Sequence, residues 1–234
     1  MLHISRPLPI ESLRLLVFDL DGTLIDSRTD LSNSVNAMLA HFGRPPQPES
    51  VIASYIGNGA GMLVRRALGD PVDESFLNQA LGCFLDYYRE HKLDHTYVYP
   101  GVHESLDALR TLPDGSQRRM AVLSNKPVGP SRAICDALGL GTRFFRVYGG
   151  NSFPSKKPDP EGLNTIIREA GVTPAETLMI GDSDVDVLTA RNAGTWVIGC
   201  RFGLAPHTLE SVEADALVDS PSDWTNLLDL AKIE

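Results

Sequence analysis

Two aspartates one residue apart stand at the end of a short apolar run, Leu15 to Phe18. Four consecutive apolar residues are typical of a strand that is buried on both faces. Asp19 and Asp21 follow this run, and Gly22 then allows a sharp turn. Because side chains alternate along an extended chain, both carboxylates could face one space, where a divalent cation would neutralise them. The pattern indicates either a metal-assisted nucleophile beside an acid/base or a plain strand followed by an acidic turn.

Further polar side chains follow three later segments of the chain. The apolar run 120–123 predicts a strand that is followed directly by Ser124 and Asn125. A pair of lysines at 156 and 157 comes after an expected strand at 144–148, and Asp182 follows an expected strand at 178–180. Ligands of open α/β sheets bind beyond the carboxyl ends of the strands. These residues therefore predict one polar site at that edge of the sheet.

The residue types at this edge favour phosphoryl chemistry. Asp19, Asp21 and Asp182 offer the hard oxygen ligands that suit Mg²⁺. Ser124 and Asn125 can donate hydrogen bonds to phosphoryl oxygens, and a lysine supplies a positive charge. A carboxylate nucleophile would divide the displacement into two steps, with an aspartyl-phosphate between them.

The elements that position these residues fall into two groups. From Thr29 to about Tyr97 the apolar residues recur at helical spacing, and no strand signal interrupts them. After Pro100 strands alternate with helices, and Pro113-Asp114-Gly115 indicates a turn between two of them. The expected fold is α/β, a doubly wound, Rossmann-like parallel sheet with an inserted all-helical cap. We expect residues 1–26 and 98–234 to form the core and residues 27–97 the cap.

Composition narrows the possible partners. The chain of 234 residues has a formal net charge of −9, which disfavours binding to nucleic acid or to an anionic membrane. No run is long enough to span a bilayer, and Pro7, Pro9 and Glu11 interrupt any apolar leader. The three cysteines are far apart, which is typical of reduced residues. We therefore expect a cytoplasmic protein that binds a small phosphorylated metabolite.

The polar stretches together resemble the four motifs of the haloacid dehalogenase superfamily. They stand in the family's order and span most of the chain: Asp19-Leu20-Asp21-Gly22-Thr23, Ser124-Asn125, Lys157-Pro158, and Gly181-Asp182-Ser183 with Asp186. The resemblance implies a hydrolase with a small helical cap after the first motif. True dehalogenases of the superfamily lack an acidic residue at the position of Asp21, so this residue implies a phosphoryl-transferring member.

The same resemblance implies a role for each motif residue. Asp19 would be the nucleophile, Asp21 the acid/base, and Lys157 the bridge between nucleophile and phosphoryl group. Lys156 is adjacent, and the assignment of Lys157 rests on the proline that follows it. The other implied roles are phosphate contacts for Thr23, Ser124 and Asn125, Mg²⁺ ligation by Asp19, Asp182 and the backbone carbonyl of Asp21, and a supporting carboxylate for Asp186.

Two stretches, Asp21–Ser27 and Tyr55–Leu68, are similar to phosphoglycolate phosphatases. This similarity implies 2-phosphoglycolate as substrate. The loop of Gly57, Asn58 and Gly59 lies just before an expected helix, where free backbone N–H groups could contact the carboxylate or phosphate of the substrate. A plain inter-helix turn is the other interpretation of that loop. Another small substrate such as a sugar phosphate, a mutase, and a regulatory protein without turnover remain alternatives. The sequence leaves open whether the chain is a monomer or a homodimer.

Overall fold

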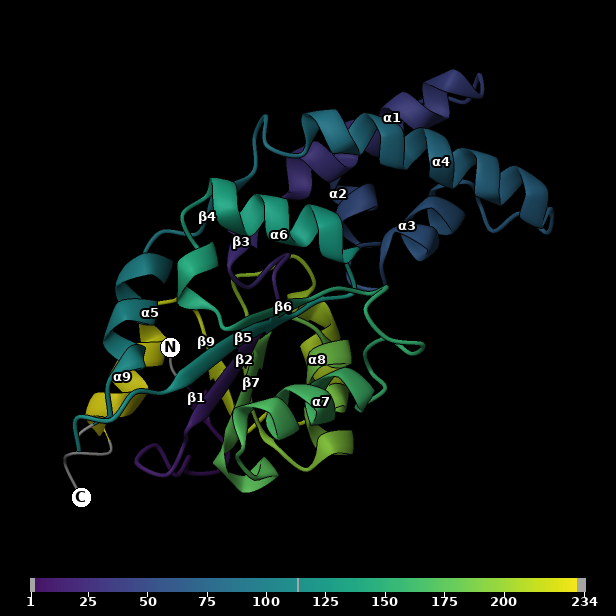
Figure 1. Ribbon diagram of the computed structural model, residues 1–234. Coiled ribbons are helices and arrows are strands. Elements are labelled where there is room, and N and C mark those ends of the chain that lie inside the picture. Colours follow the sequence, from purple (N-terminus) through teal and green to yellow (C-terminus); the bar gives the residue numbers. More distant parts are fainter. Residues whose placement is uncertain (1–2, 113, 231–234) are drawn as a thin grey trace.

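A seven-stranded sheet forms the centre of the computed structural model, which describes residues 3–112 and 114–230 (Figure 1). The strand order is β1-β9-β8-β7-β2-β5-β6, and β1 alone is antiparallel to its neighbour. The strands are β1 (His3–Ile4), β2 (Leu15–Phe18), β5 (Arg119–Leu123), β6 (Arg146–Tyr148), β7 (Thr177–Gly181), β8 (Trp196–Cys200) and β9 (Ala216–Val218). The chain winds outward from β2 to β6 and then returns to β7 on the other side of β2, which confirms the doubly wound α/β fold.

Helices cover both faces of this sheet. Alternate side chains of β2 divide between the faces, so that Leu15 and Val17 enter one apolar cluster and Leu16 and Phe18 the other. Helices α7 and α8 pack on the first face, and α5, α6 and α9 lie on the second (Figure 1). Their bounds are α5 (Val102–Arg110), α6 (Val128–Ala137), α7 (Glu161–Ala170), α8 (Asp184–Ala193) and α9 (Asp223–Leu230). Short 3₁₀ helices are η1 (Gly141–Arg143), η2 (Pro174–Glu176) and η3 (Pro206–Ser211).

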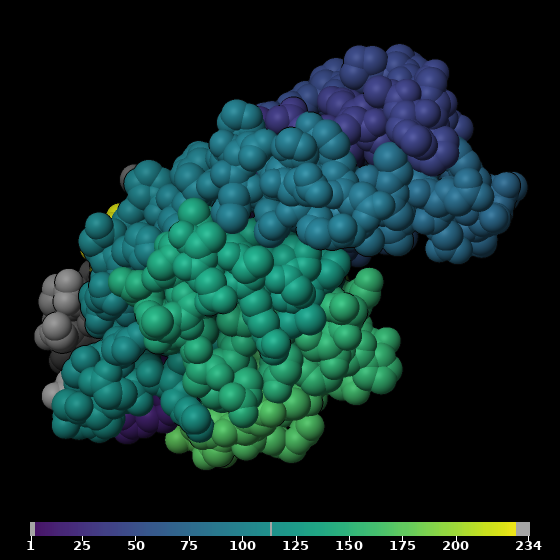
Figure 2. Space-filling view, turned by 45° about the horizontal axis from the view of Figure 1, so that its top comes forward, coloured from purple at the N-terminus to yellow at the C-terminus, as the bar shows by residue number. Residues whose placement is uncertain are grey.

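The segment that contains the first four helices projects from one end of this body, and it is coloured purple to blue in Figure 2. These helices are α1 (Arg28–His41), α2 (Glu49–Ala53), α3 (Ala60–Ala67) and α4 (Glu74–His91). A two-stranded ribbon of β3 (Ile25–Asp26) and β4 (Tyr97–Val98) joins them to the sheet domain. The ribbon lies where the expected division between cap and core falls, and we propose it as the boundary. Buried side chains of these helices belong to the same apolar cluster as Leu16 and Phe18.

Most of the expected helices and strands are present, with a few differences. Phe144 and Phe145 were expected in a strand, but β6 begins only at Arg146. The short strands β1 and β9 were not predicted, since two or three residues give no periodicity to read, and the helix α9 was not predicted either. Pro113, in an expected turn, lies outside the described residues. Within the described ranges no helix is both long and apolar enough to cross a membrane.

Candidate active site

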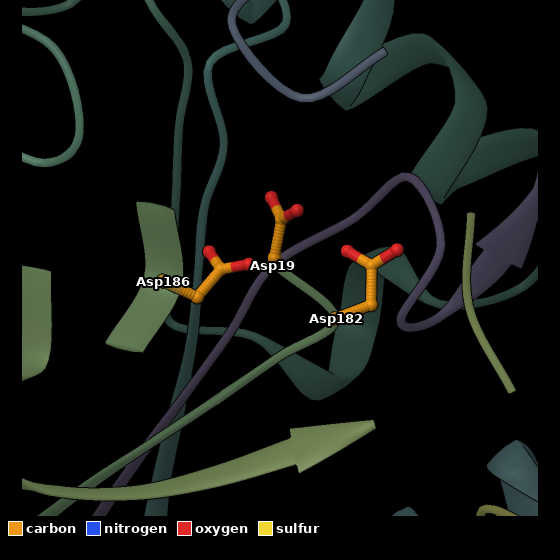
Figure 3. A group of neighbouring side chains, drawn as sticks. All are labelled: Asp19, Asp182 and Asp186. Atoms are coloured by element: carbon orange, nitrogen blue, oxygen red, sulfur yellow. The ribbon is translucent and has the colours of Figure 1, made fainter. Parts of the chain in front are cut away.

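The switch point of the sheet brings the first and last motifs together. Strands β2 and β7 are hydrogen-bonded neighbours, with Phe18 opposite Ile180. Asp19 leaves the end of β2 and Asp182 the end of β7, and Asp186 comes from the first turn of α8 (Figure 3). Each of these three carboxylates can offer an oxygen within 4.8 Å of the others, and all three are buried. The sheet topology therefore concentrates three negative charges at one point.

Lys157 lies against this acidic cluster. Its Nζ is 2.8 Å from Asp19 Oδ1 and 2.6 Å from Asp186 Oδ1. The other oxygen of Asp186 accepts from the backbone N and the Oγ of Ser183, at 3.1 and 2.7 Å. Asp186 thus caps helix α8 and holds Lys157 at once. Lys156, the adjacent alternative from the sequence, is exposed.

The electrostatics of the cluster fit a divalent cation. Burial raises the pKa of Asp19 to about 6, against the opposing effect of the Lys157 charge. Burial, followed by the charges of Asp186 and Asp19, raises the pKa of Asp182 well above its usual range. Asp19 Oδ1 faces Lys157 as an ion pair, and it has no hydrogen-bond partner among the described residues. Three buried oxygens with one lysine to balance them are suited to a hard cation. The residues present therefore could hold a metal.

The carboxylate of Asp21 lies apart from the acidic cluster. Lys126 Nζ is 2.8 Å from Asp21 Oδ1 and 3.1 Å from Oδ2, and the Ser27 hydroxyl also donates to Oδ1. The resemblance implies that Asp21 contacts the metal through its backbone carbonyl. The position of the side chain does not test this contact, which stays a prediction. Lys126 was not singled out as a site residue from the sequence. The signal available was a lysine directly after Ser124-Asn125.

The expected phosphate contacts differ in how available they are. Thr23 is fully buried, and its Oγ1 has no hydrogen-bond partner among the described residues. Ser124 accepts from the backbone N of Lys126 at 3.3 Å, which leaves its own O–H to donate. Asn125 uses both amide hydrogens, on Gly57 O and Lys157 O at 3.1 Å each. The Asn125 side chain therefore links cap and core here and has no hydrogen left for a phosphoryl oxygen.

A cavity opens between this edge of the sheet and the helical cap. It contains about 530 Å³ of unfilled space, its open mouth included, and both Asp19 and Asp21 line it. Gly57 and Gly59 of the cap loop also line it, whereas Asn58 is not among the described lining residues. The cap face of the cavity is largely apolar, with Leu31, Ile56, Ala60, Leu63, Phe84 and Leu85. The cavity therefore has charged side chains on its core side and apolar side chains on its cap side.

Glycine is required where the turn after β2 meets Asp182. Gly22 has a φ of +87°, and a Cβ there would lie 2.1 Å from Asp182 Oδ2. The same Asp182 oxygen accepts from the backbone N of Leu204 at 2.6 Å and of Ala205 at 3.0 Å. The first motif and the loop after β8 therefore orient Asp182 together.

Several other polar and aromatic residues have structural partners away from the site. Arg65 pairs with Glu74 and Asp70, and Arg66 donates to the backbone of Tyr55. His91 contacts Asp94, and the backbone N of His95 donates to Asp30. Ser183 is the N-cap residue of α8. Trp224 is buried, whereas Trp196 is only partly buried and carries the Arg6 guanidinium over its ring.

Comparisons with known proteins by family model, by sequence and by structure agree with one another. A family model described as haloacid dehalogenase-like hydrolase matches residues 16–200. A phosphoglycolate phosphatase of Pseudomonas putida is 44% identical over 88% of the chain and 75% of its own length. One from Chromobacterium violaceum is 36% identical over 94% of the chain and 98% of its own. The crystal structure of a predicted phosphoglycolate phosphatase from Haemophilus somnus aligns with a TM-score of 0.84 at 31% identity, covering 93% of this chain and 98% of that one.

Proposed function

The chain belongs to the haloacid dehalogenase-like hydrolases, and from that membership we propose that it is a Mg²⁺-dependent phosphatase acting on 2-phosphoglycolate. The observation that carries the proposal is the placement of Asp19 in ion-pair contact with Lys157 and close to two further buried carboxylates. The substrate is proposed from relatives named phosphoglycolate phosphatase that are 36% and 44% identical over most of the chain.

Asp19 is the proposed nucleophile. One of its oxygens attacks the phosphorus, the P–O bond to the leaving group breaks, and an aspartyl-phosphate forms on Asp19. The ion pair with Lys157 at 2.8 Å favours the ionised form of Asp19, against the effect of burial on its pKa. Lys157 also supplies positive charge where the phosphoryl oxygens gather. Thr23 and Ser124 are the proposed donors to those oxygens.

Asp21 is the proposed acid/base. It donates a proton to the departing alkoxide in the first step and takes one from the attacking water in the second. Ser27 and Lys126 fix its carboxylate by hydrogen bonds, so that it is positioned before the substrate binds. In the second step the water oxygen attacks the phosphorus, the bond to Asp19 breaks and inorganic phosphate leaves, so Asp21 recovers the proton that it gave up in the first step.

The metal site is proposed at the acidic cluster. Asp19 and Asp182, together with the backbone carbonyl of Asp21, would hold Mg²⁺, and Asp186 would support them through Lys157. When bound there, Mg²⁺ supplies charge neutralisation of the carboxylates and polarises the phosphoryl group. The loop of Gly57, Asn58 and Gly59 is the proposed cap contact with the substrate. We further propose a cytoplasmic location, which the three free cysteines Cys83, Cys135 and Cys200 support.

The test is phosphate release with Mg²⁺ from a panel of small phosphomonoesters. The panel contains 2-phosphoglycolate, hexose phosphates, an amino-sugar phosphate, nucleotides and an aryl phosphate. We expect kcat/KM for 2-phosphoglycolate to exceed the others by at least about tenfold, or ~1.4 kcal/mol of transition-state stabilisation. A flat profile or a sugar phosphate at the top would contradict the proposed substrate, and absence of turnover on every ester would contradict the phosphatase.

A further inference from the structure

Lys126 and Tyr88 meet at the cavity between core and cap. Lys126 follows β5 in the core, and Tyr88 belongs to helix α4 of the cap. Lys126 Nζ lies 4.7 Å from the centre of the Tyr88 ring, and both residues line the cavity. They are 6% and 3% exposed, so this contact is almost entirely shielded from solvent.

The Tyr88 hydroxyl retains a donor hydrogen next to the Lys126 ammonium. Two of the three ammonium hydrogens of Lys126 are directed to Asp21 Oδ1 and Oδ2, and the ammonium group also interacts with the Tyr88 hydroxyl. No acceptor for the hydrogen of the Tyr88 hydroxyl is present among the described residues. Burial raises the pKa of Tyr88 to about 12, so the hydroxyl keeps its proton. Buried donors almost always have an acceptor, and the cavity is where a ligand can supply it.

The charged side chains that line the cavity limit which kind of acceptor group can bind there. Among the described residues that line it, Lys126 is the only cation, and the cap contributes no charged side chain. A second anionic group on a substrate would therefore find its counter-ion at Lys126. An anion placed against the apolar cap wall would remain unpaired, which is costly in a site that excludes water.

We propose that Lys126 and Tyr88 form a subsite for the carboxylate of the leaving group. This inference rests on the proposed phosphatase function and specifies the substrate class of the same site. A carboxylate has two oxygens, one for the Lys126 ammonium and one for the Tyr88 hydroxyl. Because Lys126 is 2.8 Å from the acid/base Asp21, the carboxylate must lie close to the ester oxygen. The substrate class is therefore phosphate esters of short 2-hydroxy acids.

The surroundings hold both donors in place. The Tyr88 ring stacks on Phe84 with 5.7 Å between centroids and an interplanar angle of 6°. The backbone of Lys126 packs against Gly149, where a Cβ would lie 2.5 Å from Lys126 O. Since one donor comes from the cap and the other from the core, a carboxylate bound to both would tie the two together.

The experiment compares three esters that differ at one end. They are 2-phosphoglycolate, its uncharged amide 2-phosphoglycolamide, and ethyl phosphate, with an aryl phosphate as a general phosphatase substrate. The kcat/KM of each is measured with Mg²⁺ for the full chain. We expect the acid to exceed the amide by about 100-fold, because only the acid pairs with the Lys126 ammonium.

The variant Tyr88→Phe removes only the hydroxyl and keeps the ring beside Lys126. We expect the ratio of acid to amide to fall by about tenfold, through the loss of one hydrogen bond to a charged group. Tyr87→Phe is the matched control, because Tyr87 is the neighbouring residue, is 36% exposed and stacks on His91 rather than lining the cavity. Lys126→Met provides a second measurement. For this variant the ratio of acid to amide is compared and not the absolute kcat/KM, because Lys126 also contacts Asp21 and its loss affects both substrates.

The possible results separate this inference from the proposed function. A fall of the ratio in Tyr88→Phe and Lys126→Met, with Tyr87→Phe like the parent, supports the subsite. An unchanged ratio in Tyr88→Phe and Lys126→Met, or equal rates on acid and amide in the parent, overturns the subsite while phosphatase activity stands. Absence of phosphate release from all of the esters, the aryl phosphate included, overturns the function and the subsite with it.

Discussion

The core edge and the cap wall face each other across one cavity and are built in opposite ways. The core edge gathers buried charges that have partners, such as Lys157 with Asp19 and Asp186. Among the described residues that line the cavity, those of the cap are apolar apart from the Tyr88 hydroxyl. Buried charges must be held in place by other charges and hydrogen bonds, whereas an apolar wall needs only the right shape. In the proposed mechanism the groups that react with the phosphoryl group all stand at the sheet edge, whereas the proposed carboxylate subsite combines Lys126 of that edge with Tyr88 of the cap.

The two regions are joined by a small number of polar contacts. Asn125 donates to Gly57 O of the cap and to Lys157 O of the core, and the Lys126 ammonium lies over the Tyr88 ring. Both contacts start from the two residues that follow Ser124. The loop after β5 is therefore the place where the state of the cap can influence the position of Lys157 and Asp21.

The largest expected effect comes from removing the nucleophile. Asp19→Asn should lower kcat by at least about 10³-fold on every ester, because the amide cannot form the acyl-phosphate. The fold should persist, since Lys157 keeps its ion pair with Asp186. Steady-state phosphate release and a thermal melt of the same sample check both parts. Retention of full activity would remove Asp19 from the role of nucleophile.

A glycine at the core edge should be much less replaceable than one in the cap. Gly22→Ala should lower the free energy of unfolding by about 3 kcal/mol or more, because the new Cβ meets Asp182 Oδ2 at 2.1 Å in addition to the strain of a positive φ. Gly69→Ala is the control, with a φ of +77° and nothing within 4 Å of its Cβ. Urea denaturation of both variants measures the difference, and equal losses would contradict the role of the Asp182 contact.

The link between cap and core should have an intermediate effect. Asn125→Ala removes the donors to Gly57 O and Lys157 O, and we expect kcat/KM for 2-phosphoglycolate to fall by about tenfold, equivalent to one or two hydrogen bonds. Asn192→Ala is the matched control, because Asn192 donates to the Pro158 carbonyl of the same loop without touching the cap. Similar losses of kcat/KM in both variants would show that the effect comes from disturbing the loop of Lys157 and Pro158 and not from losing the contact with the cap.

The smallest expected effect is a pH dependence of stabilisation by Mg²⁺. Burial raises the folded-state pKa of Asp19 from 3.8 to about 6, so between these values the folded chain binds more protons than the unfolded chain. This group therefore lowers stability as the pH rises, and the loss is complete above the folded pKa. Asp182 is shifted in the same direction. Mg²⁺ competes with those protons, so it should stabilise more at high pH.

Thermal melts at pH 5 and pH 7.5, with Mg²⁺ or with EDTA, check this expectation. We expect the Mg²⁺-induced rise in Tm to be larger at pH 7.5 by about 2–4 °C, which corresponds to about 1 kcal/mol for a chain of this size. Sodium chloride at matched ionic strength is the control for general screening. An equal rise at both pH values would contradict competition between protons and metal at the acidic cluster.

The sequence predicted the fold well where patterns are long. The long cap helices α1 and α4 have apolar residues at helical spacing, and the strands β2, β5 and β7 each contain a continuous apolar run. It failed at the sheet edge that contains β1 and β9, because these strands are two and three residues long and owe their pairing to contacts distant in the chain. Phe144 and Phe145 read as strand by composition, but pairing of β6 with β5 begins at Arg146.

The sequence by itself determined which residue types stand after which strands, and the family motifs follow from that order. Only the tertiary structure decided how those groups pair. It directs Lys157 to Asp19 and Asp186, and it places Lys126 on Asp21. It also occupies both amide hydrogens of Asn125. The physical reason is that local patterns report burial and periodicity, whereas the partner of a buried polar group depends on which elements the fold brings within about 3 Å.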